Sequence, residues 1–218
     1  MLYTKYLKRV FDFGLSFIAL IILLPIMGVL FLLGMLFMRS WPFFVQERIG
    51  KGNKKFRLIK FKTMNNRTDS KGKLLPDEVR LNTYGRALRK TSLDELPELI
   101  NILRGDMSII GPRPLLPRDV IYMNDTQLKR HVVRPGLTGL AQCNGRNSLN
   151  WDEKLEMDVK YVENISFKKD IIILIKTVKK VLTCDDVNFE EGAEMDLKDW
   201  NEKKKKESTN GIEYIHNK

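Results

Sequence analysis

An uncharged run near the N-terminus constrains this chain more than any other feature. Residues 13–38 contain no charged side chain, and nearly all of them are apolar. As a helix that rises about 1.5 Å per residue, this run would be about 39 Å long, which exceeds the ~30 Å hydrocarbon core of a bilayer. A cleaved signal peptide has a shorter apolar region and a small-residue cleavage site, whereas Arg39 and Trp41 follow here. The run therefore predicts a membrane segment.

The apolar run can enter a membrane in two ways, and Pro25 at its centre bears on both. Proline removes its own amide hydrogen bond and clashes with the carbonyl group of Ile21, so we expect a kink there. Hydropathy alone favours a kinked helix that spans the bilayer. Basic residues flank the run on both sides, namely Lys5, Lys8, Arg9, Arg39, Arg48 and Lys51. Because basic residues favour the cytoplasmic side, they favour a re-entrant helix whose two ends lie on the same side.

The remainder of the chain is strongly basic. The whole sequence has a formal net charge of +11, and residues 190–218 contribute 8 acidic and 6 basic side chains. The part before that tail therefore has a net charge of +13. Such a surface can meet anionic lipid headgroups, phosphorylated substrates or nucleic acid, or it can be the solvated cytoplasmic side of a membrane protein. No nucleic-acid-binding motif accompanies the charge, so we expect no nucleic-acid partner.

Cysteine and histidine are scarce. Cys143 and Cys184 have no spacing typical of a disulfide framework or a metal site, which favours a reducing, cytoplasmic compartment. His131 and His216 are far apart in the chain, so histidine triads and histidine metal clusters are not expected.

The length of 218 residues allows one folded domain with appendages. We expect residues 1–40 to form the membrane anchor, residues 41–189 to form the domain, and the highly charged residues 190–218 to form a disordered tail. No internal repeat divides the chain further.

The local patterns predict a mainly α-helical domain with a small β-hairpin, an α+β fold. Two extended runs flank a glycine-containing turn, at residues 43–49 and 56–63. Helical patterns follow at residues 78–89, 92–103, 119–132 and 151–182, with a break near Asn164 in the last. The stretches 105–117 and 134–150 are rich in glycine and proline and predict loops. An apolar stripe at helical spacing predicts a helix packed on the core or on a membrane surface: Ile171, Leu174, Ile175, Val178 and Leu182.

The most informative short stretch is Ser92-Leu93-Asp94-Glu95. Ser-x-x-Glu is the capping box of a helix N-terminus, with Ser92 at the N-cap and Glu95 at N3, and most such pairs only cap a helix. The same geometry also serves chemistry, because a helix N-terminus lowers the pKa of a carboxylate and keeps Asp94 ionised, as a nucleophile must be. Adjacent carboxylates also suit Mg²⁺, which binds one or two of them together with substrate phosphates.

Cations would have to surround these carboxylates if a phosphorylated ligand is to bind. Arg113 lies between Pro112 and Pro114, which restrict the loop, and its planar guanidinium suits phosphate. Other candidate phosphate-binding side chains are Lys60, Lys62, Arg89, Arg134 and Arg146. Taken alone, each of these is more often a surface charge than a ligand.

Motifs of other enzyme classes are absent from the sequence. There is no G-x-x-x-x-G-K-[ST] phosphate loop, no G-x-G-x-x-G fingerprint and no G-x-S-x-G nucleophile elbow. The Asp-x-Asp pair that many metal-dependent glycosyltransferases use is also missing.

Several collinear motifs together resemble the bacterial sugar transferases, the monotopic polyprenol-phosphate phosphoglycosyl transferases. The resemblance covers roughly residues 5–185. The matching stretches are residues 8–12 (KRVFD), 61–64 (FKTM), 92–99 (SLDELPEL), 105–108 (GDMS), 111–115 (GPRPL), 133–139 (VRPGLTG), 144–147 (NGRN) and 158–164 (DVKYVEN). Any one of them is weak, whereas the ordered set over one domain is highly specific.

The resemblance implies a reaction and its partners. Such enzymes transfer a sugar 1-phosphate from a UDP-sugar to undecaprenyl phosphate, release UMP and use Mg²⁺, and they begin the assembly of bacterial glycoconjugates. The family's Asp-Glu dyad falls on Asp94, which would carry a covalent phosphosugar, and Glu95, which would help hold the metal. Arg113 matches the family's phosphate-binding arginine, and Arg89 and Arg146 are weaker matches.

The resemblance also implies a location and a substrate class. The family's anchor is a re-entrant helix bent at a proline that matches Pro25, with amphipathic interfacial helices beside it. The catalytic domain, residues 41–189, would then lie on the cytoplasmic face of the bacterial inner membrane, near membrane lipids and downstream glycosyltransferases. The chain is similar to the short branch that includes the diacetylbacillosamine 1-phosphate transferase, which implies an N-acetylated UDP-sugar. A membrane-tethered binder of anionic ligands and an inactive structural partner remain the alternatives.

Overall fold

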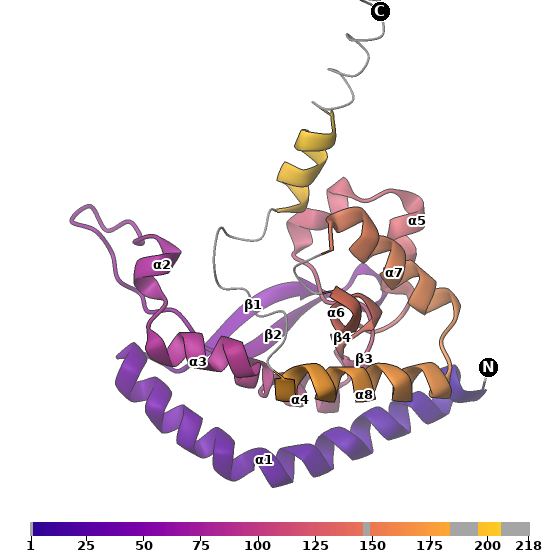
Figure 1. Ribbon diagram of the computed structural model, residues 1–218, viewed down its shortest axis with the longest axis horizontal. Helices are drawn as coiled ribbons and strands as arrows, with labels where there is room; N and C mark the ends of the chain where they lie inside the picture. The colour runs from indigo at the N-terminus through magenta and orange to yellow at the C-terminus, as the bar shows by residue number, and fades with distance from the viewer. Residues whose placement is uncertain (1, 146–148, 184–195, 206–218) are drawn as a thin grey trace, which may run out of the picture.

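The uncharged run forms one long helix, α1 (Lys8–Met38), which continues from a π-helical turn, η1 (Tyr3–Leu7). This computed structural model describes residues 2–145, 149–183 and 196–205. Within these ranges, Tyr3–Met38 is the one helix long and apolar enough to cross a membrane. Figure 1 shows that α1 is bent near its middle and lies along one side of the molecule, with both of its ends next to the body.

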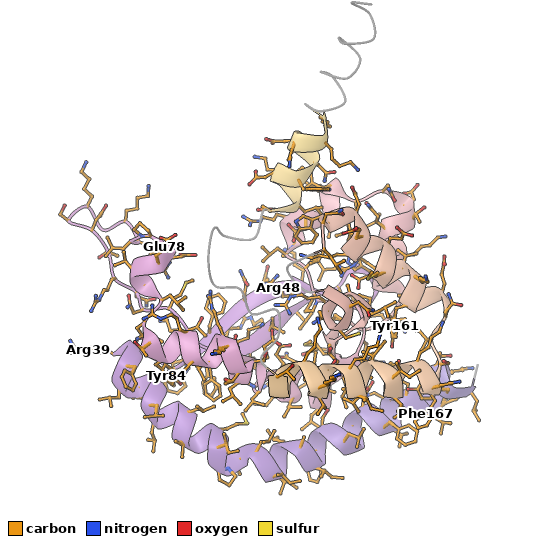
Figure 2. The ribbon with its side chains drawn as sticks, in the orientation of Figure 1. Arg39, Arg48, Glu78, Tyr84, Tyr161 and Phe167 are labelled. Carbon is orange, nitrogen blue, oxygen red and sulfur yellow. The ribbon has the colours of Figure 1, made fainter. Side chains whose placement is uncertain are left out.

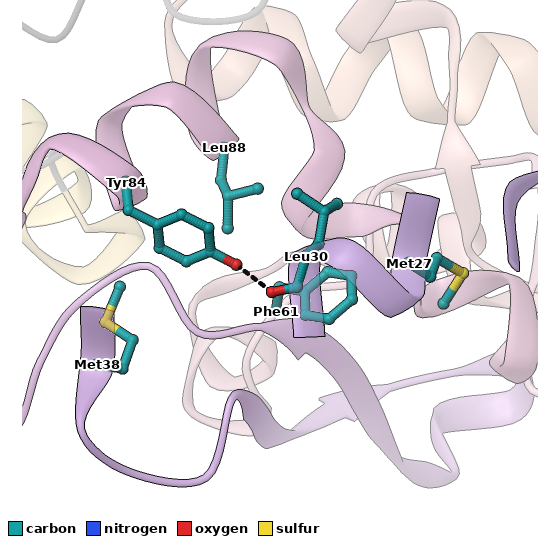
Figure 3. Close-up of a cluster of buried hydrophobic side chains, with 6 residues drawn as sticks. All are labelled: Met27, Leu30, Met38, Phe61, Tyr84 and Leu88. Carbon is teal, nitrogen blue, oxygen red and sulfur yellow. Dashed lines mark hydrogen bonds between the residues drawn. The ribbon is translucent and has the colours of Figure 1, made fainter. Parts of the chain in front are cut away.

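Pro25 lies inside α1 without breaking it, and proline is the expected cause of a bend at this position. Both halves of the helix pack on the body, since Leu20 and Leu23 contact the cluster around Ile102, and Leu30 belongs to a second cluster. Figure 3 shows that second cluster, which consists of Met27, Leu30, Met38, Phe61, Tyr84 and Leu88. The Tyr84 hydroxyl donates a 2.7 Å hydrogen bond to the Leu30 carbonyl oxygen.

The outer face of α1 is apolar and exposed. Its exposed side chains include Phe17, Ile18, Ile21, Ile22, Leu24, Val29, Leu32 and Leu36. Such a continuous apolar surface is far larger than soluble proteins usually expose, and it marks a contact surface for a membrane or a partner.

Polar contacts fasten the N-terminal half of α1 to distant parts of the chain. The Asp12 carboxylate accepts hydrogen bonds from the Ser108 hydroxyl (2.7 Å) and the Ile109 backbone N–H (3.1 Å). The Lys8 ammonium lies 2.7 Å from Asp170, which also accepts a hydrogen bond from the Tyr3 hydroxyl. Asp12 and Asp170 are both buried, so these contacts hold α1 in one orientation.

The predicted β-hairpin is confirmed. Strands β1 (Phe43–Ile49) and β2 (Lys55–Phe61) pair antiparallel, with Phe43 opposite Phe61 and Ile49 opposite Lys55. A short 3₁₀ turn, η2 (Lys51–Asn53), joins them, and Gly52 and Asn53 adopt positive φ angles there. Glycine and asparagine tolerate this conformation better than other residues, which is why the turn forms at this point.

Two stretches that were expected to be loops contain a second, parallel sheet. Strands β3 (Ser108–Ile110) and β4 (Gly136–Thr138) pair through Ser108–Gly136 and Ile110–Thr138. The two backbones approach so closely that position 136 requires glycine, because a Cβ atom on Gly136 would lie 2.1 Å from the Gly111 nitrogen. The prediction of loops was therefore wrong here, since three-residue strands leave no alternating pattern to detect.

The helices agree in part with the sequence patterns. Helices α7 (Trp151–Glu163) and α8 (Phe167–Thr183) are separated at the predicted break. The helix expected at residues 78–89 is instead α2 (Asp77–Arg80) and α3 (Thr83–Thr91), because Asn82 starts a new helix by capping the Gly85 N–H. The segment expected as one helix at residues 119–132 is divided into η4 (Pro117–Tyr122), α5 (Asp125–Leu128) and η5 (Lys129–Val132). Two further helices are α4 (Glu98–Arg104) and α6 (Leu140–Gly145).

Helix α8 presents part of its apolar stripe outward. Ile173 is buried in the core, whereas Ile171, Ile175 and Val178 are exposed. Figure 2 shows Phe167, at the start of α8, beside the N-terminal end of α1, and its ring lies 5.4 Å from that of Phe11. Leu174 packs against the core, the side chain of Leu182 lies outside the described part of the structure, and the three exposed members of the stripe continue the apolar surface of α1.

Residues 196–205 lie in the segment that was expected to be a disordered tail, yet residues 197–205 form a helix. Leu197 is buried in a cluster with Leu115, Met123 and Leu155. Asp196 also forms a 2.6 Å ion pair with Arg118. Over these residues the expectation is corrected, because two apolar side chains, Leu197 and Trp200, give a charged segment enough contact to fold against the body.

Candidate active site

Asp94 and Glu95 lie in a short 3₁₀ turn, η3 (Leu93–Glu95), between α3 and α4. Ser92 ends α3 in the left-handed conformation (φ 56°), and its side chain caps neither helix. Pro97, which has no backbone N–H, stands at the start of α4. The capping box predicted for Ser92 and Glu95 is therefore wrong, and the single helix expected at residues 92–103 is divided in two at the proline.

The pKa of Asp94 is determined mainly by burial and not by a helix dipole. Burial and the neighbouring charge of Glu95 raise the pKa of Asp94 to about 6, although Lys60, Arg113 and Arg89 oppose the rise. The predicted lowering of this pKa is thus wrong in direction, because η3 is too short to supply a macrodipole. Asp94 is still mostly ionised at pH 7, and within the described residues no hydrogen bond or ion pair engages its carboxylate.

Lys60 joins two carboxylates of this segment. Its ammonium group lies 2.7 Å from Oε1 of Glu95 and 3.0 Å from Oε1 of Glu98. The Lys60 and Glu95 side chains are only 16% and 19% exposed, and that of Glu98 only 4%, so water screens these charges little. Lys60 stands near the end of β2, and the hairpin thus brings it beneath η3 and α4.

The two glutamates respond in opposite ways. Burial opposes the ionisation of Glu95, but Lys60 and Arg113 outweigh it and lower its pKa to about 2. Burial and the charge on Glu95 raise the pKa of Glu98 to about 7. One carboxylate therefore stays charged across the physiological range while the other is poised to hold a proton.

Arg113 approaches Glu95 from a loop that is tied down through its carbonyl groups. Its guanidinium Nη1 lies 3.3 Å from Oε1 of Glu95, and its side chain is 52% exposed. The carbonyl oxygens of four consecutive residues each accept a hydrogen bond from a different donor: Pro112 from Gly136 N–H, Arg113 from Arg130, Pro114 from Arg48 and Leu115 from Ile49 N–H. Because two prolines remove N–H groups from this loop, its carbonyls provide the anchoring.

The other predicted phosphate-binding side chains lie at different distances from this centre. The charge of Arg89 lowers the pKa of Asp94, and its Nε–H group donates a 3.1 Å hydrogen bond to the Thr63 hydroxyl. Lys62 instead contacts the Ser40 hydroxyl (3.0 Å), and Arg134 contacts the Gly105 carbonyl oxygen (2.8 Å). Arg146 lies outside the described residues.

Two side chains of the cluster were missed from the sequence. Glu98 lies one turn after Glu95 in the same motif, a spacing that could have indicated it. Arg48 lines a small cleft together with Leu58, Lys60, Glu98, Arg113 and Pro114. Its Nε atom is buried without a hydrogen-bond partner in the described part of the chain, and burial and the charge of Arg113 lower its pKa to about 10. Figure 2 shows Arg48 at the centre of the molecule, beside the hairpin.

The carboxylates fit a magnesium ion that a phosphorylated ligand helps to hold. In the described ranges, no three or more His, Cys, Asp or Glu side chains group into a complete metal site. Mg²⁺ commonly takes one or two carboxylates and fills its shell with water and substrate phosphates. Asp94 and Glu95 are adjacent in the chain. Lys60 and Arg113 both contact Oε1 of Glu95, so its other oxygen and the Asp94 carboxylate could supply such ligands.

Comparison with known proteins adds a family to this geometry. The family model described as bacterial sugar transferase matches residues 3–184. The chain is 49% identical over 186 residues to the uncharacterized sugar transferase EpsL of Bacillus subtilis. The aligned region covers 83% of this chain and 90% of that protein.

Two further relatives have names that state a reaction. The chain is 36% identical over 200 residues to the undecaprenyl-phosphate galactose phosphotransferase of Salmonella typhimurium, covering 84% of this chain and 42% of that protein. It is 35% identical over 187 residues to the UDP-N-acetylgalactosamine-undecaprenyl-phosphate N-acetylgalactosaminephosphotransferase of Aeromonas hydrophila, covering 82% and 44%. The chain thus spans less than half the length of these two relatives.

Proposed function

This chain belongs to the bacterial sugar transferase family, and from that premise we propose that it transfers a sugar 1-phosphate from a UDP-sugar to undecaprenyl phosphate and releases UMP. The observation that carries the proposal is the ionised Asp94 carboxylate beside the ion-paired group of Glu95, Lys60 and Arg113. A carboxylate that no hydrogen bond or ion pair engages within the described residues is available as a nucleophile, and nearby cations can neutralise phosphate charge.

The reaction proceeds in two displacements at one phosphorus atom. First, a carboxylate oxygen of Asp94 bonds to the phosphorus next to the sugar, and the bond from that phosphorus to the bridging oxygen breaks as UMP leaves. This step leaves a covalent aspartyl phosphosugar. Next, a phosphate oxygen of undecaprenyl phosphate bonds to the same phosphorus, and the bond to Asp94 breaks. The carboxylate is restored and a polyprenyl diphosphosugar is formed.

The surrounding side chains have different tasks. The half-exposed guanidinium of Arg113 can turn to a diphosphate while its backbone stays fixed. Lys60 holds Glu95 in place and keeps it ionised. When bound, Mg²⁺ would neutralise phosphate charge, and Glu95 with Asp94 would hold it. Such transfer depends mainly on alignment and charge neutralisation, which this arrangement supplies.

The proposed membrane attachment is re-entrant. Both ends of the bent α1 lie next to the body, and the outer face of α1 and the stripe on α8 are apolar. The helix would therefore enter one leaflet of the inner membrane and return, with the catalytic domain at the cytoplasmic face where undecaprenyl phosphate presents its headgroup. A reporter fused to Met1 should be accessible only from the cytoplasm, and access only from the periplasm would exclude this arrangement.

The sugar is a separate part of the proposal. The two relatives with named substrates take galactose and N-acetylgalactosamine phosphates, and the chain is about equally similar to both. We propose that the donor is an N-acetylated UDP-sugar. Parallel assays would distinguish it from a donor without the acetamido group, and they would use UDP-N-acetylgalactosamine, UDP-N-acetylglucosamine, UDP-galactose and UDP-glucose. The lipid product would serve downstream glycosyltransferases.

A UMP-release assay tests the reaction directly. Purified protein with Mg²⁺, undecaprenyl phosphate and each UDP-sugar should release UMP, and EDTA should stop the release until Mg²⁺ is restored. Asp94→Asn should abolish release, whereas Asp125→Asn, on the exposed first turn of α5, should not. Because the pKa of Asp94 is raised in the folded protein, ionised Asp94 weakens folding, so Asp94→Asn should melt no lower than the wild type at pH 8. Full activity of Asp94→Asn would remove Asp94 as the nucleophile.

A further inference from the structure

The Arg113 loop meets a buried guanidinium that the sequence patterns do not single out. Nη2 of Arg130 donates a 2.6 Å hydrogen bond to the carbonyl oxygen of Arg113. Arg130 stands in η5 and is 2% exposed. The neighbouring bond, from Arg48 to the Pro114 carbonyl, is longer at 3.3 Å. Arg130 therefore makes the closer side-chain contact with the backbone that presents the Arg113 side chain to Glu95.

Arg130 is itself fixed from two directions. Its Nε and Nη2 atoms donate to Oδ2 of Asp158 on α7, at 3.1 and 2.6 Å. Its Nη1 atom lies 3.2 Å from Nε2 of His131, and Nδ1 of His131 lies 2.6 Å from Oδ1 of Asn53 in the hairpin turn. One side chain thus links α7, the hairpin turn and the Arg113 loop.

The hydrogen positions in this network follow from its chemistry. A guanidinium only donates, so Nε2 of His131 must accept, and the Nδ1–H group must then donate to Asn53. Burial and the charge of Arg130 lower the pKa of His131 to about 4, which agrees with a neutral imidazole. Every contact has a matching donor and acceptor, and such a satisfied buried network is rigid.

We propose that Arg130, oriented by Asp158, is a positioning residue that fixes the backbone of Arg113 and thereby aims its guanidinium at the donor diphosphate beside Glu95. The proposal rests on the proposed function, because it assigns Arg113 to the diphosphate of the UDP-sugar. Arg130 acts only through Arg113, since its own guanidinium is enclosed by protein groups.

Lysine cannot replace Arg130 in this role. A guanidinium presents a planar fork of donors, which here meets a carboxylate, an imidazole and a carbonyl group in fixed directions. An ammonium at the end of a flexible stem would keep the charge opposite Asp158 but lose one or more of the other contacts. Small misplacements of a phosphate-binding group can cost up to about 100-fold in rate.

A double-mutant cycle on kcat/KM for UMP release tests this proposal. Arg130→Lys should lower kcat/KM at least tenfold in the wild-type background and less than twofold in Arg113→Ala, because the loop then has no side chain to aim. The matched control is Arg80→Lys, since Arg80 likewise bridges a carbonyl group (Asn65, 2.9 Å) and a carboxylate (Asp77, 3.3 Å). It should leave kcat/KM unchanged. An equal loss from Arg130→Lys in both backgrounds, or no loss in the wild-type background, would overturn the proposal.

Hydrogen exchange provides a readout that does not need activity. In Arg130→Lys, the loop amides, which are those of Gly111, Arg113, Leu115 and Leu116, should exchange faster, while those of α4 should keep their wild-type rates. Unchanged exchange in the loop would also overturn the proposal. If Arg130→Lys does not fold, Asp158→Asn gives the same two measurements with a smaller expected loss. A wild-type protein that releases no UMP from any donor would refute the proposed function, and loop exchange alone would then decide the positioning.

Discussion

Replacing Glu98 by glutamine should stabilise this protein at alkaline pH. The Glu98 side chain is only 4% exposed, and burial together with the charge of Glu95 raises its pKa from 4.5 to about 7. Between these two values, the folded protein binds more protons at this site than the unfolded chain does. Stability therefore falls as the pH rises through this window. Glutamine has nearly the same shape and its carbonyl oxygen can still accept from Lys60, but it never ionises.

The size of the effect follows from the two pKa values. Integrating the difference in bound protons gives a cost of about 1 kcal/mol at pH 5 and about 3 kcal/mol at pH 8 for the ionisation of Glu98. The advantage of Glu98→Gln should thus grow by about 2 to 3 kcal/mol between these pH values. For a domain of this size, that corresponds to a growth of roughly 5 to 10 °C in the difference between the melting temperatures.

Thermal unfolding of the detergent-solubilised protein at pH 5 and pH 8 measures this effect. The control is Glu95→Gln, which makes the same glutamate-to-glutamine change but should change stability in the opposite direction. Because the pKa of Glu95 is lowered to about 2, its charge stabilises the fold above pH 4.5, and that stabilisation is lost as the pH falls toward 2. Glu95→Gln should therefore be destabilised at pH 8 by up to about 3 kcal/mol. A melting-temperature difference for Glu98→Gln that is the same at pH 5 and pH 8 would refute this reasoning.

Three further predictions concern the nucleophile, the parallel sheet and the C-terminal helix. Since Asp94 must be ionised to attack, kcat/KM for UMP release should rise through about pH 6 and level off by pH 8, and a flat profile down to pH 5 would contradict this. Gly136→Ala should lower stability by about 3 kcal/mol in thermal unfolding, because its Cβ would meet the Gly111 backbone. Gly28→Ala, inside α1, meets no atom within 4 Å and should leave stability unchanged or raise it by up to about 1 kcal/mol. Leu197→Ala should cost about 2 to 4 kcal/mol in the same assay, and an unchanged melting temperature would mean that this helix does not dock.

Local patterns predicted those parts of the fold whose causes are local. The hairpin was predictable because its turn residues, such as Gly52, favour positive φ angles. The break between α7 and α8 left a similar local signal near Asn164. The capping box at Ser92 also fitted its local pattern, yet Pro97 and the left-handed conformation of Ser92 overrode it.

The rest of the site depends on contacts between residues that are distant in the chain. Lys60 meets Glu95 across 35 positions, and Arg130 meets Asp158 across 28. Single-sequence reasoning named Lys60 as one of several cations without a reason to prefer it over Lys62, which lies two residues away and contacts Ser40 instead. Only the packing of the hairpin against η3 distinguishes the two lysines.

The fastening of α1 has a consequence for the order in which the protein is made. Lys8 and Asp12 are held by Asp170 and by Ser108, which are 162 and 96 residues away. The ribosome therefore releases the apolar helix long before its polar partners exist, and under the proposed membrane attachment the helix waits in the lipid until they appear. Contacts of such long range form late and slowly in folding. Insertion should thus precede docking, and under the proposed attachment a nascent chain that ends before residue 100 would hold its helix in the membrane without the polar contacts that fix its orientation.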